Sequence, residues 1–429
     1  MEKTMDIEQR LRYWRKRVFI SLWITYASFY LCRVNMSVAL PGIMDEYGLS
    51  KTSMGAVLSA IFFMYAVGQF VNGQLGDKFG ARKLISLGIL CSAFLNIIFA
   101  FLPGVVSAMA LIWGLNGYFQ AMGWSPSVKT IANWFPLKSR GKIAGLFGSC
   151  YQFGNAASWA LAGFVVGLLG WRWAFWIPAG IFIIMAIQWF INGRNAPEEV
   201  GLPTIEEEAE GLIQQYDPRD DHHLGFSYTI HRILTDFRIW LVAFSLFGLN
   251  IIRYGFMDWA PTYMFEVEKA TISAAAYKAI AIPVAGSIGA LFAGWSSDRF
   301  FRSRRAPIMV IMLVLLMILT AIYPSLARFH WAWSLTCLLG IGFATYGPHV
   351  MICATISMDY ASRKAAASAA GFIDGCGYLG ASLTGILTGY FVDNYGWIYG
   401  FYFWIGGALM ATVLMSFLWN YKPQKGKYH

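Results

Sequence analysis

The sequence predicts an all-α integral membrane protein with twelve transmembrane helices, arranged as two parallel six-helix halves. Three observations lead to this fold class: the composition, the number of apolar segments and an internal repeat. The 429 residues are 57% hydrophobic and only 13% charged, whereas soluble domains are usually about a quarter charged. A single water-soluble core seldom grows beyond about 250 to 300 residues. A chain this long and this apolar therefore needs lipid as its solvent.

Twelve apolar segments have the length of about 20 residues that a bilayer crossing requires. They start near residues 18, 54, 83, 106, 142, 173, 239, 273, 307, 331, 365 and 397. The first carries Arg33 and is too long for a signal peptide, so we expect it to be retained. The longest polar stretch lies between spans six and seven. It divides the chain into an N-terminal half (1–193), a cytoplasmic linker (194–236) and a C-terminal half (237–429).

The basic residues are distributed unequally between alternate loops. One side of the membrane receives 25 Lys and Arg residues, including both termini, and the other receives five. Since basic loops stay in the cytoplasm, we expect both termini to be cytoplasmic, as in a multi-pass protein of a bacterial inner membrane. The acidic run in the linker is interpreted as a solvated connection.

The sequence shows no pattern for catalysis or for a cofactor. All six Cys lie in apolar runs, without a C-x-x-C pair or a suitably spaced His. No Ser/His/Asp constellation or Gly-rich nucleotide loop is present either. We therefore expect no enzyme activity, no metal, no cofactor and no nucleic-acid partner, and we expect a monomer in the lipid bilayer.

Four landmarks recur between the halves at offsets of 220 to 226 residues. The loop from Gly73 to Lys83 (GQLGDKFGARK) after span two matches Gly294 to Arg305 after span eight, and Arg33 in span one matches Arg253 in span seven. Because six spans separate the copies, both halves have the same orientation, as in parallel repeats related by an axis along the membrane normal.

These motifs resemble those of the major facilitator superfamily, and this resemblance covers nearly the whole chain. Four stretches resemble the organophosphate:phosphate antiporter family within it, which includes glycerol-3-phosphate and hexose-phosphate transporters. They are YLCR at 30–33, NGYFQAMGWSP at 116–126, APEEVGLP at 196–203 and IRYGFMDWAPTY at 252–263. The first stretch is ambiguous, because the sequence RVNMSVA at 33–39 is also similar to anion:cation symporters that carry organic acids, but those do not share the stretch at 252–263.

Arg33 and Arg253 lie 15 and 14 residues into their spans, at matching depths in opposite halves. An arginine near mid-bilayer costs at least about 2.5 to 3.5 kcal/mol and remains charged. An anion between two guanidiniums would relieve their repulsion, and the planar fork suits phosphate oxygens. The pair predicts a dianion clamp, and the resemblance implies that both residues hold the substrate phosphate. The alternative is that buried acids, Asp258 or Asp374, neutralise them.

Aromatic residues accompany the clamp in the sequence. Tyr26 and Tyr30 precede Arg33 by seven and three residues, on one helical face. Tyr65, Tyr346 and Tyr378 match positions that line the cavity in the resembled family. Packing alone is the competing interpretation for each of them.

The chain departs from the resembled family at three positions. Tyr151 stands where the glycerol-3-phosphate transporter has a substrate-site histidine, and Val34 and Gln69 replace two lysines. The expected cavity is therefore less positively charged, which leaves the organic part of the substrate open.

Three further residues have two interpretations each. Lys129 either extends to the cytoplasmic surface or lies at the cavity mouth. Asp374 either pairs with Arg253 or Lys129, or carries a proton. His349 either packs or contacts substrate. We further expect Asp77 and Asp298, with Arg82 and Arg299 nearby, to lock the halves together on the cytoplasmic side.

The sequence thus predicts an antiporter that exchanges an organophosphate ester for inorganic phosphate by a rocker-switch form of alternating access. The first alternative is a proton-coupled symporter for a carboxylate or phosphate ester, with Asp374 or His349 as the proton carrier. The second is a transporter-like membrane sensor of external sugar phosphate.

Overall fold

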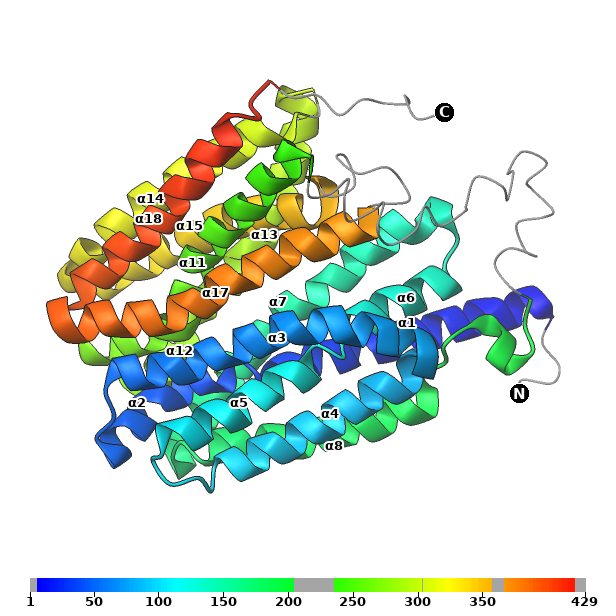
Figure 1. Ribbon diagram of the computed structural model, residues 1–429, viewed down its shortest axis with the longest axis horizontal. Helices are drawn as coiled ribbons and strands as arrows, with labels where there is room; N and C mark the ends of the chain where they lie inside the picture. The colour runs from blue at the N-terminus through cyan, green and yellow to red at the C-terminus, as the bar shows by residue number, and fades with distance from the viewer. Residues whose placement is uncertain (1–5, 204–234, 303, 357–365, 421–429) are drawn as a thin grey trace.

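The structure, a computed structural model, describes residues 6–203, 235–302, 304–356 and 366–420, and every regular element in these ranges is helical. Figure 1 shows two helical bundles that lie side by side. The helices of the first bundle are α1 (Ile7–Phe29), η2 (Tyr30–Cys32), α2 (Asn35–Tyr47), α3 (Lys51–Phe79), α4 (Ala81–Phe99), α5 (Val106–Gln120), α6 (Trp124–Trp134), α7 (Leu137–Leu169) and α8 (Trp173–Asn192).

The second bundle follows the short helix η3 (Pro197–Val200) and the segment 204–234, most of the expected linker, which lies outside the described residues. Its helices are α11 (Phe237–Glu266), α12 (Ile272–Ala279), α13 (Ala281–Phe300), α14 (Arg305–Phe329), α15 (Trp331–Val350), η5 (Met351–Ile356), α17 (Ala366–Tyr395) and α18 (Trp397–Ser416). The expected all-helical fold with two bundles is confirmed. The boundaries at 193 and 236 stay a prediction.

Nine helical segments of the described chain are long and apolar enough to cross a membrane. The other three expected spans coincide with α1 to α2, α5 to α6, and α17. Two of these are interrupted helices, so neither presents one long apolar run.

The first span is not one continuous helix, because the chain leaves α-helical geometry between α1 and α2. Arg33 has φ −124° and ψ −49°, and the turn before it is a 3-10 helix. The carbonyl oxygen of Cys32 instead accepts hydrogen bonds from the side-chain amides of Asn116 (3.0 Å), Asn96 (3.3 Å) and Gln120 (3.4 Å). Neighbouring helices thus satisfy the backbone group that the break releases, as a buried break requires.

Two other spans are interrupted near prolines. Pro126 follows the break between α5 and α6, and Pro283 follows the break between α12 and α13. Proline lacks the backbone N–H of a continuous helix, so it favours such breaks. In the first of these breaks, Ala121 and Met122 are buried.

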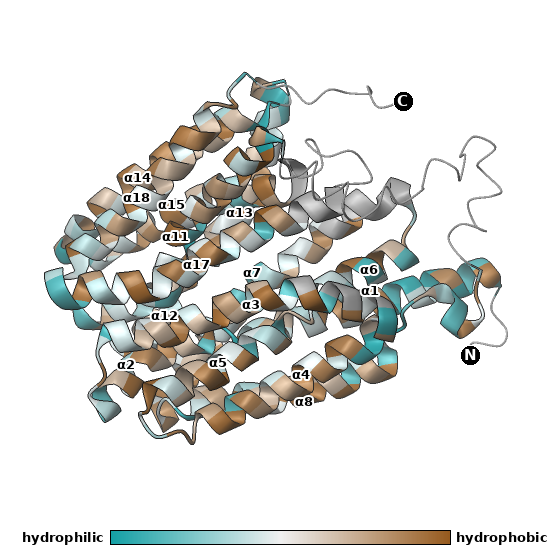
Figure 2. Ribbon diagram, viewed as in Figure 1, coloured by the Kyte–Doolittle hydropathy of each residue, from teal (hydrophilic) through white to brown (hydrophobic). Residues whose placement is uncertain are grey.

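The outward surface of the bundles suits lipid. Large apolar side chains such as Phe94, Leu111, Ile184, Ile288 and Leu291 are exposed. Figure 2 shows hydrophobic residues along the middle of α4, α8 and α14 and hydrophilic residues near the helix ends. A soluble protein rarely exposes apolar area on this scale, so the chain is a multi-pass membrane protein.

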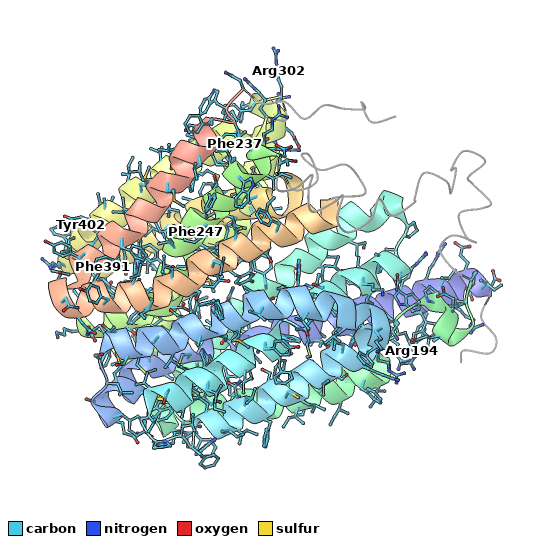
Figure 3. All side chains as sticks on the ribbon, viewed as in Figure 1. Arg194, Phe237, Phe247, Arg302, Phe391 and Tyr402 are labelled. Carbon is cyan, nitrogen blue, oxygen red and sulfur yellow. The ribbon has the colours of Figure 1, made fainter. Side chains whose placement is uncertain are left out.

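The two ends of the molecule differ in character. Arg194 and Arg302 lie at the end where α1 begins and α18 ends, and Figure 3 shows them far from Phe391 and Tyr402. We name this the basic end. The opposite end contains Lys51, Glu266 and Asp393, and we name it the gate end. In Figure 1 the bundles lie close together at the gate end and diverge toward the basic end.

Candidate functional site

Arg33 occupies the break in the first span and is only 8% exposed. Its Nε and Nη2 both donate to Oε1 of Gln120, at 3.3 and 3.2 Å. Its guanidinium carbon lies 5.0 Å from the ring centroid of Tyr30 and 4.6 Å from that of Tyr65. The cation is therefore held by a neutral amide and two aromatic rings, which stabilise it without cancelling its charge.

Gln120 is itself fixed by a buried polar network. Its Nε2 donates to Ser92 Oγ at 3.0 Å, and Ser92 donates to Asn116 Oδ1 at 2.5 Å. Sequence reasoning placed Gln120 in a family motif but not in the site. A buried amide at the end of α5, one turn after Asn116, was the available signal.

Arg253 lies in the middle of α11 and is 5% exposed. Its guanidinium carbon is 4.7 Å from the ring centroid of Tyr254 and 5.2 Å from that of Tyr346. Its Nε is buried without a hydrogen-bond partner. Tyr254 follows Arg253 directly in the chain and was also missed as a site residue. Arg253 therefore keeps a hydrogen-bonding group available for a ligand.

The two arginines belong to one closed ring of eight residues, which we name the clamp ring. From Arg33 it passes through Tyr30, Tyr151 and Tyr346 to Arg253, and it returns through Tyr254, Tyr378 and Tyr65. Successive ring centroids are 6.4 Å (Tyr30 to Tyr151), 6.3 Å (Tyr151 to Tyr346), 6.3 Å (Tyr254 to Tyr378) and 4.5 Å (Tyr378 to Tyr65) apart. Six helical segments (η2, α3, α7, α11, α15 and α17) contribute to it, together with the turn that holds Arg33.

The clamp ring joins the two bundles. Tyr151 meets Tyr346 and Tyr65 meets Tyr378, so an aromatic contact between bundles lies on each side of the arginine pair. Tyr26 packs against Tyr30 from outside the ring, at 6.2 Å between centroids. Of the tyrosines proposed from the sequence, five are ring members and Tyr26 supports one of them.

No carboxylate oxygen of the described residues lies within 4.0 Å of a nitrogen of Arg33 or Arg253. Asp258 and Asp374 both interact electrostatically with Arg253, but neither is in contact with it. One carboxylate oxygen of Asp258 is buried without a hydrogen-bond partner. Among the described residues, therefore, no direct ion pair neutralises either clamp arginine, as the alternative interpretation would require.

The remaining candidates lie around the ring. His349 packs edge-on against Tyr346, with ring centroids 6.0 Å apart, and its Nε2 is 3.8 Å from Cys353 Sγ. Lys129 is half-buried on α6. Gln69 accepts a hydrogen bond from Ser125 at 3.1 Å, while Val34 is buried beside Arg33 in sequence. Roles for all of these stay predictions.

At the gate end, polar contacts connect the bundles directly. Lys51 Nζ is 3.1 Å from Glu266 Oε1. The carboxylate of Asp393 accepts hydrogen bonds from the backbone N–H of Lys51 (3.2 Å), the backbone N–H of Thr52 (2.7 Å) and the Thr52 hydroxyl (2.7 Å). Asp393 on α17 thus caps the start of α3 across the interface, in the manner of an N-cap.

The helix backbones also meet there. A Cβ on Gly55 would lie 2.3 Å from the carbonyl oxygen of Gly385, and one on Gly389 would lie 2.2 Å from that of Lys51. Only glycine permits this approach of α3 to α17. The structure is therefore closed at the gate end.

Two of the four residues expected to lock the cytoplasmic side, Arg82 and Asp298, make contacts within their own bundles. Arg82 donates from Nε to the carbonyl of Phe190 at 2.6 Å, and its backbone N–H donates to Asn195 Oδ1. Asp298 pairs with Arg305 at 2.7 Å, while Arg299 is exposed. Asp77 is on α3, but its side chain lies outside the described part. Their role as a lock stays a prediction.

We expect Asp393→Ala to weaken closure of the gate end. Three hydrogen bonds to an exposed carboxylate are lost, worth together about 1 to 2 kcal/mol, which shifts the balance of conformations by about 5- to 30-fold. A cysteine at buried Thr262, in a cysteine-free background, should then be alkylated correspondingly faster by an impermeant reagent added at that side. Asp45→Ala removes an exposed acid at the same end and serves as the control. Equal alkylation rates in both variants would contradict a role of Asp393 in closing the gate end.

Comparison with known proteins identifies the family. Residues 22–383 match the model of the Major Facilitator Superfamily. The chain is 32% identical to the glycerol-3-phosphate transporter of Bacillus subtilis, over 95% of this chain and 92% of that protein. It is 30% identical to a probable hexose phosphate transport protein of Chlamydia pneumoniae (96% and 93%) and 28% identical to the membrane sensor protein UhpC of Escherichia coli (99% and 97%).

Among solved structures, a bacterial homolog of the human lysosomal transporter Spinster superposes with a TM-score of 0.74. The alignment covers 95% of this chain and 96% of that chain at 14% identity, so it supports the fold alone. The relatives named above are transporters and a membrane sensor, not enzymes, and they confirm the resemblance to the organophosphate:phosphate antiporters. The chain belongs to the major facilitator superfamily.

Proposed function

We propose that the chain is a secondary transporter that exchanges an organophosphate ester for inorganic phosphate by alternating access. The observation that carries the proposal is the clamp ring, which contains two buried guanidiniums from opposite bundles. Among the described residues, neither of them contacts a carboxylate. Arginine forks bind phosphate oxygens bidentately. The names of the relatives, which include glycerol-3-phosphate and hexose phosphate transporters, support the same class of substrate.

The two bundles supply the moving parts of the proposed mechanism. Each contributes one arginine, so an anion bound to both attracts the bundles toward each other. Contacts at the gate end close one side of the site, and their rupture, with closure at the basic end, would expose it to the other side. The exchange step needs no covalent chemistry.

The test is exchange of labelled phosphate by purified protein in liposomes. Vesicles loaded with unlabelled phosphate should accumulate external labelled phosphate by exchange, and a sugar phosphate or glycerol phosphate in the lumen should support the same uptake. Uptake that is no faster than in protein-free vesicles would contradict the transport proposal.

Two other functions have a specific observation behind them. Buried Asp258 and half-buried Asp374 have no ion-pair partner among the described residues, which favours proton-coupled symport. Similarity to UhpC favours a sensor. A sensor would bind phosphate esters without exchanging them, so the liposome assay separates a sensor from a transporter.

The proposed orientation places both termini and the basic end in the cytoplasm of a bacterial cell, with the protein in the inner membrane. We expect a cysteine at Glu207 or Gln424, two positions outside the described residues, to react only with reagents on the cytoplasmic side. A cysteine at Ser50, at the start of α3, should react only with external reagents. Labelling of position 207 from outside would overturn this topology.

A further inference from the structure

The chain after α8 folds back onto the basic end of the first bundle, where Figure 1 shows it as a short green helix beside the start of α1. Pro197 begins this helix, η3, and Gly201 ends it with φ +68°, a conformation that glycine adopts readily. The backbone N–H of Leu202 then donates to the carbonyl oxygen of Pro197 at 3.2 Å, and the Leu202 side chain is buried in the core. We name residues 193–202 the clasp. It contains most of the APEEVGLP stretch at 196–203.

The clasp is fixed to α1 by a hydrogen bond and a cation–π contact. Nη2 of Arg10 donates to the carbonyl oxygen of Val200 at 2.9 Å. The guanidinium carbon of Arg194 lies 5.2 Å from the ring centroid of Trp14, which is buried. Figure 3 shows Arg194 at this end of the bundle. The first turns of α1 therefore hold the clasp near both of its ends.

The clasp also meets the end of α6. The indole N–H of Trp134 donates to the carbonyl oxygen of Arg194, and the side-chain amide of Asn133 donates to that of Asn195, both at 3.0 Å. The carbonyl oxygen of Trp134 in turn accepts a hydrogen bond from Nε of Arg15 in α1 at 2.8 Å. Each of the three segments, α1, α6 and the clasp, is thus bonded to the other two.

Asn195 connects the clasp to the turn between α3 and α4. Its Oδ1 accepts a hydrogen bond from the backbone N–H of Arg82, the second residue of α4, at 2.8 Å. The N-cap residue of α4 is Gly80, which has no side chain to accept this bond. A Cβ on Gly80 would lie 2.8 Å from Nδ2 of Asn195, so glycine leaves room for the amide. Asn195 therefore takes the place of an N-cap side chain, from 113 residues further along the chain.

Glu199 fixes the orientation of the Asn195 amide. Its carboxylate accepts hydrogen bonds from the backbone N–H of Asn195 at 3.1 Å and from Nδ2 of the same residue. Because Nδ2 points to the carboxylate, Oδ1 points to α4. Arg82 is held at a second atom as well, since its Nε donates to the carbonyl oxygen of Phe190 in α8 at 2.6 Å. The start of α4 is therefore attached to both α8 and the clasp.

The second copy of this turn, between α13 and α14, is held in a different way. Arg305, the first residue of α14, donates to Asp298 at 2.7 Å and to Ser297 at 3.1 Å, and both acceptors belong to α13. These contacts come from the two helices that the turn joins. The first copy depends instead on a remote segment, so the clasp is an addition to the repeated unit.

The clasped turn lies on the boundary between the bundles. α3, which leads into it, meets α17 at Gly55 and at Tyr65, and it continues to Phe79 at the basic end. The bundles diverge at that end (Figure 1). Closure of the basic end must bring the tip of α3 toward the second bundle. A tip that is attached to α4, α8, α6 and α1 moves together with its whole bundle.

We infer that the clasp makes the basic end of the first bundle a rigid body, and that Asn195 is a positioning residue that sets the tip of α3 for closure. Without this cap the turn would adopt several arrangements, and closure would have to select one of them at a cost in entropy. The contacts of the clasp among the described residues include no member of the clamp ring. The conformational step should therefore slow while phosphate binding stays unchanged.

The first experiment measures rigidity directly. Spin labels are placed at Lys16 in α1 and Lys83 in α4, two exposed positions, in a cysteine-free background, and their distance distribution is recorded by pulsed electron paramagnetic resonance in liposomes. Asn195→Ala should widen the distribution at least about twofold, because the attachment of α4 to the clasp is lost. A label pair at exposed Arg302 and Phe417 in the second bundle is the control and should not change. An unchanged width between positions 16 and 83 would overturn the rigid-body role.

The second experiment separates rate from affinity. Asn195→Ala should lower the maximal rate of labelled phosphate exchange by about 5- to 10-fold. The dissociation constant of phosphate, measured on purified protein in detergent, should stay within about twofold of wild type, because the clamp ring is intact. Glu198→Gln, which changes an exposed acid of the same segment, should leave both quantities unchanged. An undiminished rate, or a loss of affinity as large as the loss of rate, would overturn the positioning role.

A paired exchange of side chains tests the cap itself. Asn195→Asp brings a second carboxylate against Glu199 and should slow exchange as much as Asn195→Ala does. Adding Glu199→Gln reverses the polarity of the pair, because the new amide donates to Asp while the Asp carboxylate still accepts from the Arg82 N–H. The double variant should recover at least half of the wild-type rate. A double variant no faster than Asn195→Asp alone would refute the cap.

The rate measurements rest on the proposed phosphate exchange, whereas the distance measurement does not. If the wild-type protein exchanges no labelled phosphate, the proposed function fails, and the distance distributions still decide whether the clasp holds the bundle rigid.

Discussion

Replacing either clamp arginine by lysine should reduce phosphate exchange at least 100-fold while the protein still inserts into the membrane. Lysine keeps the charge, but its ammonium is a point donor that cannot form two parallel hydrogen bonds with phosphate. A hydrogen bond to a charged group is worth about 1.5 to 3 kcal/mol, and each 1.4 kcal/mol is a factor of ten. The measurement is labelled phosphate exchange in liposomes, for Arg33→Lys and Arg253→Lys separately.

The control for this experiment is Arg328→Lys. Arg328 lies near the end of α14, outside the clamp ring. The Arg328→Lys variant should exchange phosphate at the wild-type rate. Exchange within about threefold of wild type by either clamp variant, at equal amounts of reconstituted protein, would show that the fork geometry is not required.

Gln120→Glu should weaken the apparent affinity for phosphate by about 10- to 100-fold. Gln120 already meets Arg33 Nε and Nη2 through one oxygen, so a carboxylate at this position would form a buried ion pair with Arg33. The phosphate would then compete with an internal anion for the same guanidinium. The half-saturating phosphate concentration in exchange assays measures the effect.

Gln120→Leu is the matched comparison because it removes the same acceptor without adding a charge. It should raise the half-saturating concentration less than Gln120→Glu does, since Arg33 keeps its charge and loses only the acceptor that orients its guanidinium. If Gln120→Leu raises the half-saturating phosphate concentration as much as Gln120→Glu does, or more, Gln120 has a packing role instead.

The positions of the clamp residues could be predicted from the sequence because membrane burial makes a charge conspicuous. Arg33 and Arg253 stand out in apolar spans at matching depth, and the repeat relates them. The structure places them in one ring with five of the proposed tyrosines. Depth and repeat symmetry were sufficient to predict the two arginines, whereas Tyr65, Tyr346 and Tyr378 were proposed from the family resemblance.

The neutral members of the site could not be predicted in the same way. Gln120 and Tyr254 are common residue types in buried helices, and only the three-dimensional contacts distinguish them from packing residues. The break at Arg33 has no proline or glycine to announce it. It depends on amides of α4 and α5 that capture the Cys32 carbonyl, a tertiary effect that local sequence does not encode.

Contacts across the gate end were also invisible in the sequence. Asp393 caps a helix that starts 342 residues earlier in the chain, and no local pattern links the two segments. The sequence motifs instead drew attention to Asp77 and Asp298 at the other end, where the described contacts of Arg82 and Asp298 remain within each bundle.

Unpaired guanidiniums explain why exchange should be favoured over net transport. With the clamp empty, two buried cations lack a counter-anion, and moving between conformations in that state is costly. The carrier should therefore change conformation mainly when phosphate or a phosphate ester is bound. Asp374→Asn should leave phosphate:phosphate exchange working, because no proton carrier is needed.

The dependence of uptake on internal phosphate tests this account most directly. Liposomes containing the protein are loaded either with phosphate or with sulfate-free, phosphate-free buffer, with and without an imposed pH gradient, and uptake of external labelled phosphate is followed. We expect uptake at least 10-fold above the phosphate-free level only where phosphate is inside, whatever the pH gradient. Accumulation into phosphate-free vesicles that is driven by the pH gradient and abolished by Asp374→Asn would contradict the antiport mechanism and establish proton symport.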